Sequence, residues 1–532
     1  MKIITKILTK SPLLVSESDS RLYDKSQKEF RGKAYIPGSA LKGALRETAD
    51  SFSHVEKYRL MNESLFGKEG TQTGKLFFSN FIAEESNFII RTHVVISRKL
   101  RVSKKGKLFN SRALESGNIL NGEIYCPDKI TDEEINYLKM LSGIVKKIGG
   151  RRSSGYGYID ISFEFTENEK RESMLSKSNY YILNLKPTEH FITVESKSKG
   201  YLYKSSDYIK GETIRGAFAK ILEKDDSFRE IIYGEKVKFP NVYASEESDI
   251  PVPIPEVIVK KKYKENKEGI FSSLLPKIVE IELRKKGVEI TFEDVLKGNE
   301  ERLEKASGYY DILSGFVKNP KTETKSFTQT ALSRKTRASQ KNMLRSYITK
   351  FSDNYNGLIR ITDLNLVEKI TEKTKIYVGN SKTRGFGNFE VFFDECPDLK
   401  NLFKKNIESF NAEINKTFNI LKIEKDTIFI PVLFISDLIL PYGKKPQDFF
   451  GMNMFYSNFR KNLTTGWNTG TNNKKPTYEV INKGSLFIFE ENKDYNFEKF
   501  FNLFNEGVGL KTGSGYGTFV IPDLINVKGD KK

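Results

Sequence analysis

Hydrophobic residues recur at helical spacing in two stretches of the chain that share one pattern. Residues 36–46 (IPGSALKGALR) predict a turn at Pro37-Gly38, followed by a helix that Ser39 caps and whose buried stripe begins at Leu41. Residues 209–219 (IKGETIRGAFA) repeat this pattern. The repetition predicts two related helices, each of which begins directly after a turn.

Each predicted helix contains a glycine directly after a cation. A glycine inside a helix costs about 1 kcal/mol relative to alanine. One explanation is the close approach of another backbone, such as that of a polynucleotide, and the alternative is a small residue packed between helix and sheet. On the first explanation, the residues of these helices that contact RNA are Ser39, Lys42, Gly43, Arg46, Arg215 and Gly216.

A basic block also occurs twice, as residues 96–108 (ISRKLRVSKKGKL) and 332–344 (LSRKTRASQKNML). A strand with cations at nearly every second position presents them on one face, so each block predicts a basic hairpin that crosses a single strand of RNA. Leu108 and Phe109, or Met343 and Leu344 in the second block, would lie against bases. A solvated hairpin is the alternative. The aligned cations are Arg98, Lys99, Arg101 and Lys105 in the first block and Arg334, Lys335, Arg337 and Lys341 in the second.

A glycine loop of the form G-x5-G-[YF]-G occurs three times, as loop 1 (149–157, GGRRSSGYG), loop 2 (379–387, GNSKTRGFG) and loop 3 (509–517, GLKTGSGYG). Each loop precedes an apolar strand, whereas a nucleotide P-loop follows a strand and precedes a helix.

Backbone N–H groups, a cation and a ring together suit a sugar-phosphate backbone with a stacked base. Tight loops with the ring in the core are the alternative. The loop residues predicted to bind RNA are Gly149, Gly150, Arg151, Arg152, Gly155, Tyr156, Gly157, Lys382, Arg384, Gly385, Phe386, Gly387, Lys511, Gly515, Tyr516 and Gly517.

The three kinds of block recur in one order, which indicates duplicated modules. Strand, helix, strands and a closing strand predict an α+β fold of tandem ferredoxin-like (RRM-like) modules, with antiparallel sheets and helices on one face. The predicted division is a module at 1–165, a linker at 166–178, a module at 179–395 with an insertion at about 243–325, a connecting helix at 396–425, a reduced module at 426–525 and a tail at 526–532.

The chain has 532 residues and a formal net charge of +19, from 88 Lys and Arg against 69 Asp and Glu. This excess favours a polyanionic partner, nucleic acid before a membrane surface, with a lysine-rich background as the alternative. Cys126 and Cys396 are the only cysteines, and with three histidines they predict a reducing cytoplasm, no metal and no cofactor. We expect neither a signal peptide nor a membrane span.

At these motifs the sequence resembles the RAMP superfamily (repeat-associated mysterious proteins) of type III CRISPR–Cas effectors. Residues 35–47 (YIPGSALKGALRE) and loop 1 resemble the two hallmark motifs of the seven-type backbone subunit. Residues from about 180 to 522 resemble the five-type subunit of type III-D systems. The segments that carry this second resemblance are 211–219, 332–347, 436–440 (SDLIL), 466–468 (GWN), 484–485 and 509–517.

The resemblance implies a fusion of a backbone subunit with a five-type subunit in an antiviral, crRNA-guided ribonucleoprotein. The implied partners are crRNA, target RNA and other type III effector subunits. Seven-type subunits line the crRNA spacer, where a hairpin thumb kinks the guide–target duplex, and residues 97–107 match the thumb's place in the chain. Five-type subunits hold the 5′ tag. The implied function is to hold the guide RNA for target recognition.

Active family members cut target RNA with an aspartate whose register falls on Leu22, with Asp24 and Asp19 close by. Asp24 is therefore the candidate catalytic residue of an alternative function, an endoribonuclease that cleaves target RNA or processes precursor crRNA. A lone carboxylate would need a divalent metal or aligned 2′-hydroxyl chemistry. A protein scaffold with incidental charge is the third alternative.

Overall fold

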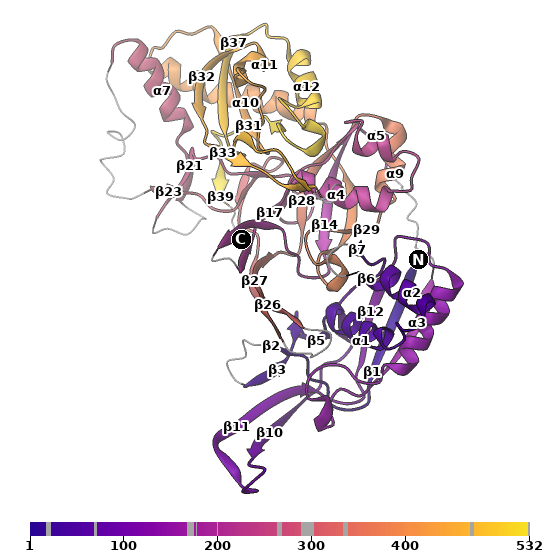
Figure 1. The fold of residues 1–532 in the computed structure, drawn as a ribbon. Coiled ribbons are helices and arrows are strands. Elements are labelled where there is room, and N and C mark those ends of the chain that lie inside the picture. The colour runs from indigo at the N-terminus through magenta and orange to yellow at the C-terminus, as the bar shows by residue number, and fades with distance from the viewer. Residues whose placement is uncertain are drawn as a thin grey trace. The chain divides into compact units, whose positions relative to one another are not determined.

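The chain forms two compact units in a computed structural model that describes residues 1–532 except 18–22, 69–71, 167–174, 177, 199–200, 263–268, 289–302, 333–338, 469–472 and 530–532 (Figure 1). Unit 1 consists of Met1–Lys170, Thr188–Val194 and Tyr377–Phe389. Unit 2 consists of Arg171–Pro187, Glu195–Ile376 and Glu390–Lys532. Loop 2 therefore belongs to unit 1, although its sequence position is far from the rest of that unit.

Unit 1 is built on an antiparallel sheet whose elements follow the βαββαβ order of a ferredoxin-like unit. These elements are β1 (Lys2–Thr9), α1 (Gly38–Asp50), α2 (Glu56–Phe66), β9 (Phe81–Ala83), β12 (Ile119–Tyr125), α3 (Asp132–Ile144) and β13 (Ile159–Thr166). The strand order is β13-β1-β12-β9, with β1 and β12 in the centre. Ile3 and Ile7 of β1 are fully buried, as expected for alternate residues that face a core.

The first helix of unit 1 begins at Gly38, two residues earlier than the predicted cap at Ser39 implies. The predicted cap at Ser39 is wrong, because the capping position is Pro37 and no side chain of the helix accepts from the first turn. The backbone N–H of Gly38 instead donates to the Oδ1 of Asn80 at 3.0 Å. A side chain distant in sequence therefore satisfies one of the amides that a helix start leaves unpaired.

A second sheet of unit 1 has the order β10-β11-β3-β2 and carries a long hairpin (Figure 1). Its strands are β10 (Phe88–Ile96), β11 (Ser103–Leu114), β3 (Lys25–Gln27) and β2 (Ser16–Glu17). The predicted hairpin is present, but Arg98, Lys99 and Arg101 do not lie on a strand. They lie in the turn, which the N–H of Ser97 closes by donating to the carbonyl of Val102 at 2.9 Å.

Unit 2 repeats both sheets of unit 1. The sheet strands of its first module have the order β19-β28-β14-β30, and the second sheet has the order β15-β16-β27-β26. In both hairpins the second strand pairs in parallel with a short strand, β3 or β16. The elements are β14 (Tyr180–Pro187), β15 (Val194–Ser198), β16 (Leu202–Ser205), α4 (Gly211–Leu222), β19 (Val242–Ala244), β26 (Glu323–Leu332), β27 (Ser339–Phe351), β28 (Tyr355–Ile361), α9 (Val367–Thr371) and β30 (Asn388–Glu395).

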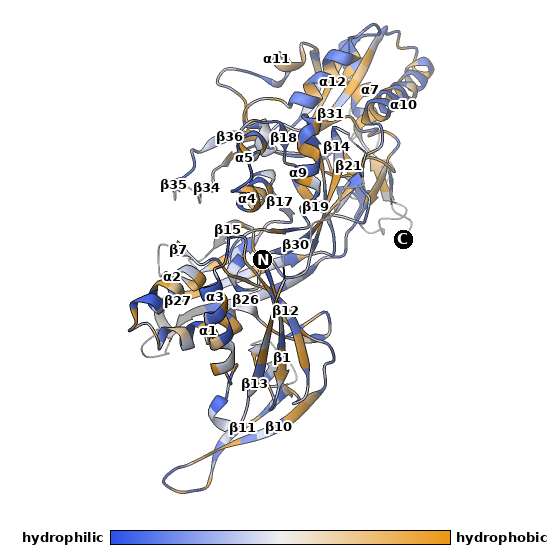
Figure 2. Ribbon diagram, turned by 90° about the vertical axis from the view of Figure 1, so that its right-hand side faces the viewer, coloured by the Kyte–Doolittle hydropathy of each residue, from blue (hydrophilic) through white to orange (hydrophobic). Residues whose placement is uncertain are grey.

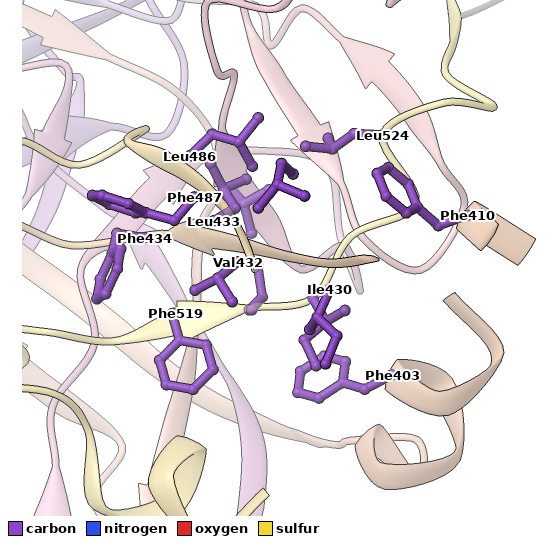
Figure 3. Close-up of a cluster of buried hydrophobic side chains, with 14 of the residues drawn as sticks. Phe403, Phe410, Ile430, Val432, Leu433, Phe434, Leu486, Phe487, Phe519 and Leu524 are labelled. Carbon is purple, nitrogen blue, oxygen red and sulfur yellow. The ribbon is translucent and has the colours of Figure 1, made fainter. Parts of the chain in front are cut away.

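A third module follows the connecting helix α10 (Leu399–Ile420). Its elements are β31 (Thr427–Phe434), α11 (Pro446–Phe450), β32 (Asn453–Asn458), β37 (Leu486–Asn492), α12 (Phe497–Glu506) and β38 (Phe519–Val520). The strand order β32-β37-β31-β38 matches the other two modules. Phe403 and Phe410 of α10 pack with Ile430 of β31 and Phe519 of β38 in the core of this module (Figure 3).

Between β19 and β26, additional elements form two small sheets, β20-β24-β25-β39 and β22-β21-β23. They are β20 (Pro251–Pro253), β21 (Ile258–Lys261), β22 (Ile270–Ser272), α7 (Leu274–Lys285), β23 (Leu303–Lys305), β24 (Tyr309–Asp311) and β25 (Phe316–Lys318), with β39 (Lys528–Gly529) from the end of the chain. The predicted α+β class with antiparallel sheets is confirmed. Among the described residues, no helix is both long and apolar enough to span a membrane.

The three glycine loops have one backbone conformation. Each starts from a left-handed residue, Arg151, Ser381 or Lys511, and continues into a single 3-10 turn (Arg152–Ser154, Lys382–Arg384 or Thr512–Ser514). The last glycine of each loop has a positive φ, and its carbonyl accepts a backbone hydrogen bond from the residue directly before the loop. A Cβ on this glycine would lie 2.0 Å or less from a backbone carbonyl oxygen in all three loops. Glycine is therefore required there.

Two alanine substitutions in unit 1 separate a required glycine from a dispensable one. Gly157→Ala places a Cβ 2.0 Å from the carbonyl oxygen of Ile148 and is expected to lower the stability by about 3 kcal/mol. Gly43→Ala meets no atom within 4 Å and is expected to raise the stability by about 0.5–1 kcal/mol. Calorimetric unfolding of both variants tests this, and equal effects of the two changes would contradict it.

Candidate nucleic-acid interface

The turn of the β10–β11 hairpin presents cations and apolar side chains together to solvent. Arg98, Lys99 and Arg101 are exposed, as is Lys105 at the start of β11. Exposed apolar residues alternate with them: the relative exposures of Ile96, Leu100 and Leu108 are 58%, 69% and 68%. The apolar residues of β10 appear in orange in Figure 2. A surface of this kind offers both charge for phosphates and hydrophobic contact for bases.

A cluster of rings and cations lies where this hairpin leaves the rest of unit 1. His93 of β10 stacks on its cross-strand partner Phe109, with 5.1 Å between ring centroids. Lys25 and Arg151 lie over the Phe109 ring at 5.9 and 4.8 Å. Arg91 lies 5.3 Å from the centre of the Tyr156 ring. Three cations from β3, β10 and loop 1 therefore converge on one part of the surface.

Burial first, and then the positive charges of Arg151, Arg91 and Lys25, lower the pKa of His93. His93 is therefore neutral at pH 7, and its Nε2 lies 2.8 Å from Ser111 Oγ and 3.2 Å from the Tyr156 hydroxyl. The cluster holds its positive charge on the three long cations rather than on the imidazole. This group of three cations, with the carboxylate of Asp24 at its edge, suits a phosphate group.

Asp24 is exposed at the edge of this cluster, and its Oδ2 accepts a hydrogen bond from the backbone N–H of Asn110 at 2.8 Å. This contact gives the side chain a structural part in fixing β11. In the described part of the chain, no group of three or more His, Cys, Asp or Glu is placed to hold a metal ion. Asp19 and Leu22 lie outside the described residues.

On α1, the residues predicted to bind RNA separate into buried and exposed ones. Ser39 and Gly43 are exposed. Arg46 donates to the carbonyl of Gly67 at 2.7 Å, and Lys42 is buried with its ammonium 5.9 Å from the centre of the Phe78 ring. Because Lys42 faces the interior, the prediction that it contacts RNA is wrong for this fold.

The interior glycines of the two related helices are both exposed, and a Cβ on Gly43 or Gly216 would meet no atom within 4 Å. The explanation that they are needed for helix packing is therefore wrong. Arg215, beside Gly216, donates to the carbonyl of Ile232 at 2.9 Å and also to Ser514. Arg215 therefore makes its contacts within the protein, as Lys42 does.

The glycine loops differ from the predicted anion-binding nests. The rings of Tyr156, Phe386 and Tyr516 are buried, with exposures of 1%, 7% and 8%. Their predicted stacking on bases is wrong, because the rings lie in the protein core. The amides of Gly150 and Gly157 in loop 1 donate to the carbonyls of Leu14 and Pro12 and do not converge on an open site.

The loop cations have different surroundings. Arg152 lies 3.6 Å from Glu47 of α1, Arg384 is exposed, Lys382 is half-buried, and Lys511 lies 4.0 Å from the centre of the Tyr478 ring. Arg334, Lys335 and Arg337 lie outside the described residues, as does the side chain of Lys341.

Lys25, Arg91 and His93 belong to this cluster but were not predicted to bind RNA. The usable signal was the pairing of the two hairpin strands, which sets His93 opposite Phe109. Lys25 could not be found in this way, because β3 reaches β11 through a parallel pairing between segments far apart in sequence.

Residues 6–160 match the family model of the RAMP superfamily. The match runs from β1 to the start of β13 and so covers the ferredoxin-like module of unit 1 together with its hairpin. No curated protein matches the chain.

Similar solved structures come from CRISPR complexes. One chain of a type III-B Cmr-beta complex bound to cognate target RNA and AMPPnP aligns with 64% of this chain and 95% of its own length, at 12% identity and a TM-score of 0.35. A chain of a type III-B Cmr-beta complex bound to cognate target RNA aligns with 31% of this chain and 60% of its own length, at 18% identity and a TM-score of 0.26. A chain of a type IV-B CRISPR complex aligns with 34% of this chain and 96% of its own length, at 16% identity and a TM-score of 0.25. TM-scores this low do not establish a shared fold.

Lys42 provides a pH-dependent test of the packing at α1. Burial, then the charges of Arg384 and Arg46, lower the pKa of Lys42 to about 7 from an ordinary value of 10.5. Between pH 10 and pH 7 the unfolded chain holds this proton and the folded chain does not, so the stability falls as the pH falls. Lys42→Met is expected to stabilise the protein by about 2–4 kcal/mol at pH 6.5 and by little at pH 10.

Unfolding midpoints at pH 6.5, 8 and 10 measure this gain. Lys405→Met, an exposed change on α10, is the control and is expected to show no such pH dependence. A gain for Lys42→Met that is equal at all three pH values would contradict the assignment.

Proposed function

We propose that this protein is a crRNA-binding structural subunit of a type III CRISPR effector complex, which holds guide RNA for the recognition of target RNA. The observation that carries the proposal is the RAMP match over 6–160, within which the structure has an exposed basic hairpin on a ferredoxin-like module. The repetition of that hairpin in unit 2 supports a second contact with the same RNA.

The hairpin turn acts as the part that crosses the RNA. Its three turn cations, Arg98, Lys99 and Arg101, pair with phosphates, and the exposed Leu100 and Leu108 contact the faces of bases that the hairpin separates. The cluster of Lys25, Arg91 and Arg151 at the base of the hairpin holds a further phosphate of the same strand.

The exposed glycines of α1 and α4 complete the proposed path. A polynucleotide backbone approaches Gly43 more closely than it could approach a residue with a side chain, which is a reason to keep glycine at a position where alanine would stabilise the helix. In this proposal the module of unit 1 is the backbone-type part. Unit 2 is the five-type part that holds the 5′ tag.

An endoribonuclease is the second candidate, and it rests on one observation: Asp24 is an exposed carboxylate beside the cation cluster. Its hydrogen bond to the Asn110 amide assigns it an alternative role in the strand pairing of β11.

Neutralising the hairpin turn tests the binding proposal. The triple variant Arg98→Gln, Lys99→Gln and Arg101→Gln is expected to bind a labelled single-stranded RNA more weakly. The slope of log K against log salt is expected to fall by about 2, because each phosphate contact to a single strand contributes about 0.7. Fluorescence anisotropy over a salt titration measures both quantities.

The matched control removes the same charge from another surface. Lys404, Lys405 and Lys416 are exposed on α10, and their replacement by Gln changes the net charge equally. If both triple variants lose the same affinity and slope, the binding depends on overall charge and the hairpin proposal fails.

Asp24→Asn tests the nuclease candidate, because an amide oxygen still accepts from the Asn110 N–H while the carboxylate charge is lost. For a structural subunit, the complex assembled with the variant cuts target RNA at the rate of the unchanged complex. A loss of cleavage of a hundredfold or more, with unchanged RNA binding, would establish the nuclease function instead.

A further inference from the structure

Two of the three glycine loops pack against the start of the first helix of the module that precedes them in the chain. Loop 2 packs on α1 within unit 1, and loop 3 packs on α4 within unit 2. Because all three loops have one backbone conformation, these two contacts form two examples of one interaction.

In the first contact, the backbone of loop 2 lies directly against the backbone at the start of α1. A Cβ on Gly385 of loop 2 would lie 2.8 Å from the backbone nitrogen of Gly38 and 2.2 Å from the Oδ1 of Asn80. The side-chain oxygen of Asn80 accepts from the backbone N–H of Gly38, and the backbone N–H of Asn80 donates to the carboxylate of Glu189. Arg384 of the same loop lies close enough to lower the pKa of Lys42. The loop is therefore fitted against the helix start without room for a side chain.

The second contact, between loop 3 and the start of α4, has the same close backbone approach and the same asparagine cap. A Cβ on Gly515 of loop 3 would lie 3.4 Å from the Cα of Gly211 and 2.2 Å from the Phe239 carbonyl oxygen. The amide of Gly211 donates to Asn241 at 2.9 Å, as that of Gly38 does to Asn80. Ser514 accepts from Arg215, which occupies the helix position of Lys42.

Loop 1 has this shape, but no helix start within the described residues packs on its Gly155; its Arg152 instead lies 3.6 Å from Glu47, which is well past the start of α1. Ser153, Ser154 and Gly155 are exposed, and a Cβ on Gly155 would meet nothing within 4 Å. The corresponding residues of loop 3, from Thr512 to Gly517, are all buried. Loop 1 is therefore built like the two loops that pack on a helix start, yet no described residue of this chain covers Ser153, Ser154 and Gly155.

We propose that loop 1 docks on the helix start of a different protein chain that contains the same kind of ferredoxin-like module. The two internal examples give the partner's chemistry: a helix that begins with glycine, carries Lys or Arg four residues later and glycine at the next position, as in Gly38-x-x-x-Lys42-Gly43 and Gly211-x-x-x-Arg215-Gly216. An asparagine of the partner caps the first amide.

The partner is not a second copy of this chain. Both helix starts that fit the pattern, those of α1 and α4, already hold a loop. The corresponding helix of the third module, α11, has five residues and begins with Pro446 rather than glycine. Contacts of this type are head-to-tail, so this chain offers its loop at one end and no matching free helix start within its described residues at the other.

A photo-crosslinker in the full chain tests the proposal. Ser154→p-benzoylphenylalanine is introduced in the producing cells, the complex is irradiated, and mass spectrometry identifies the joined peptide. A large side chain is acceptable there, since Arg384 occupies the same place in loop 2. The expected product joins residue 154 to a peptide of another protein with the glycine and Lys/Arg spacing given above.

Three results would overturn the proposal: a crosslink to RNA, a crosslink to a second copy of this chain, or no crosslink at all. Arg384→p-benzoylphenylalanine calibrates the last result, because it must join loop 2 to α1 within the same chain. A crosslink at 384 together with none at 154 counts against the proposal.

A pair of loop variants gives an independent readout. Gly155→Asn adds a Cβ that nothing in this chain obstructs, and asparagine tolerates the positive φ, so the variant folds with an unfolding midpoint within a few degrees of the parent. It is expected to lose the crosslink at 154 at least tenfold. Ser153→Thr is the control, since Thr383 stands there in loop 2, and it is expected to retain the crosslink. Equal crosslinking by both variants would contradict the docking.

Discussion

The structure depends on a close approach between a glycine and a carbonyl oxygen that is repeated in each of the three modules. At Gly157, Gly387 and Gly517 the carbonyl lies so near that no Cβ fits, and the amide of the residue bearing that carbonyl donates back to the glycine. This close approach and the single hydrogen bond beside it fix the loop as a rigid projection. A rigid projection loses little conformational entropy when it packs on another surface, which suits it to serve as a standard joint between modules.

This joint also explains why the chain divides as it does. Tyr377–Phe389 is counted with unit 1 because loop 2 is fitted to α1, while the strands on either side of it belong to the sheet of unit 2. The folding of unit 1 therefore requires residues that are more than three hundred positions from α1 in sequence. Contacts of such sequence separation form late and slowly, so we expect unit 1 to complete its packing only after the second module is formed.

The sequence predicted the repeated elements well because repetition is visible without knowing what each copy touches. The connecting helix α10 and the three matched loops are confirmed. The predictions from sequence were wrong where a residue's role depends on a segment far away in the chain. Ser39 has the residue type of a helix cap, but Asn80 takes that role across the fold. The loop rings resembled binding residues, and only the three-dimensional packing places Tyr156 in the core. The cluster around His93 depends on the parallel pairing of β3 with β11, which no local pattern encodes.

Net charge alone does not locate an interface in this protein, because the repeated cations lie in two different environments. Those on the first helices, Lys42 and Arg215, face the interior, and the pKa of Lys42 is lowered to about 7, so it contributes little positive charge to a polyanion. Those in the turn of the β10–β11 hairpin are exposed to solvent. The helix cations and the hairpin cations differ in when the cost of desolvation arises. At α1 the fold itself already desolvates the cation. At the hairpin the cost would arise only on binding, where the release of counterions from RNA would offset it.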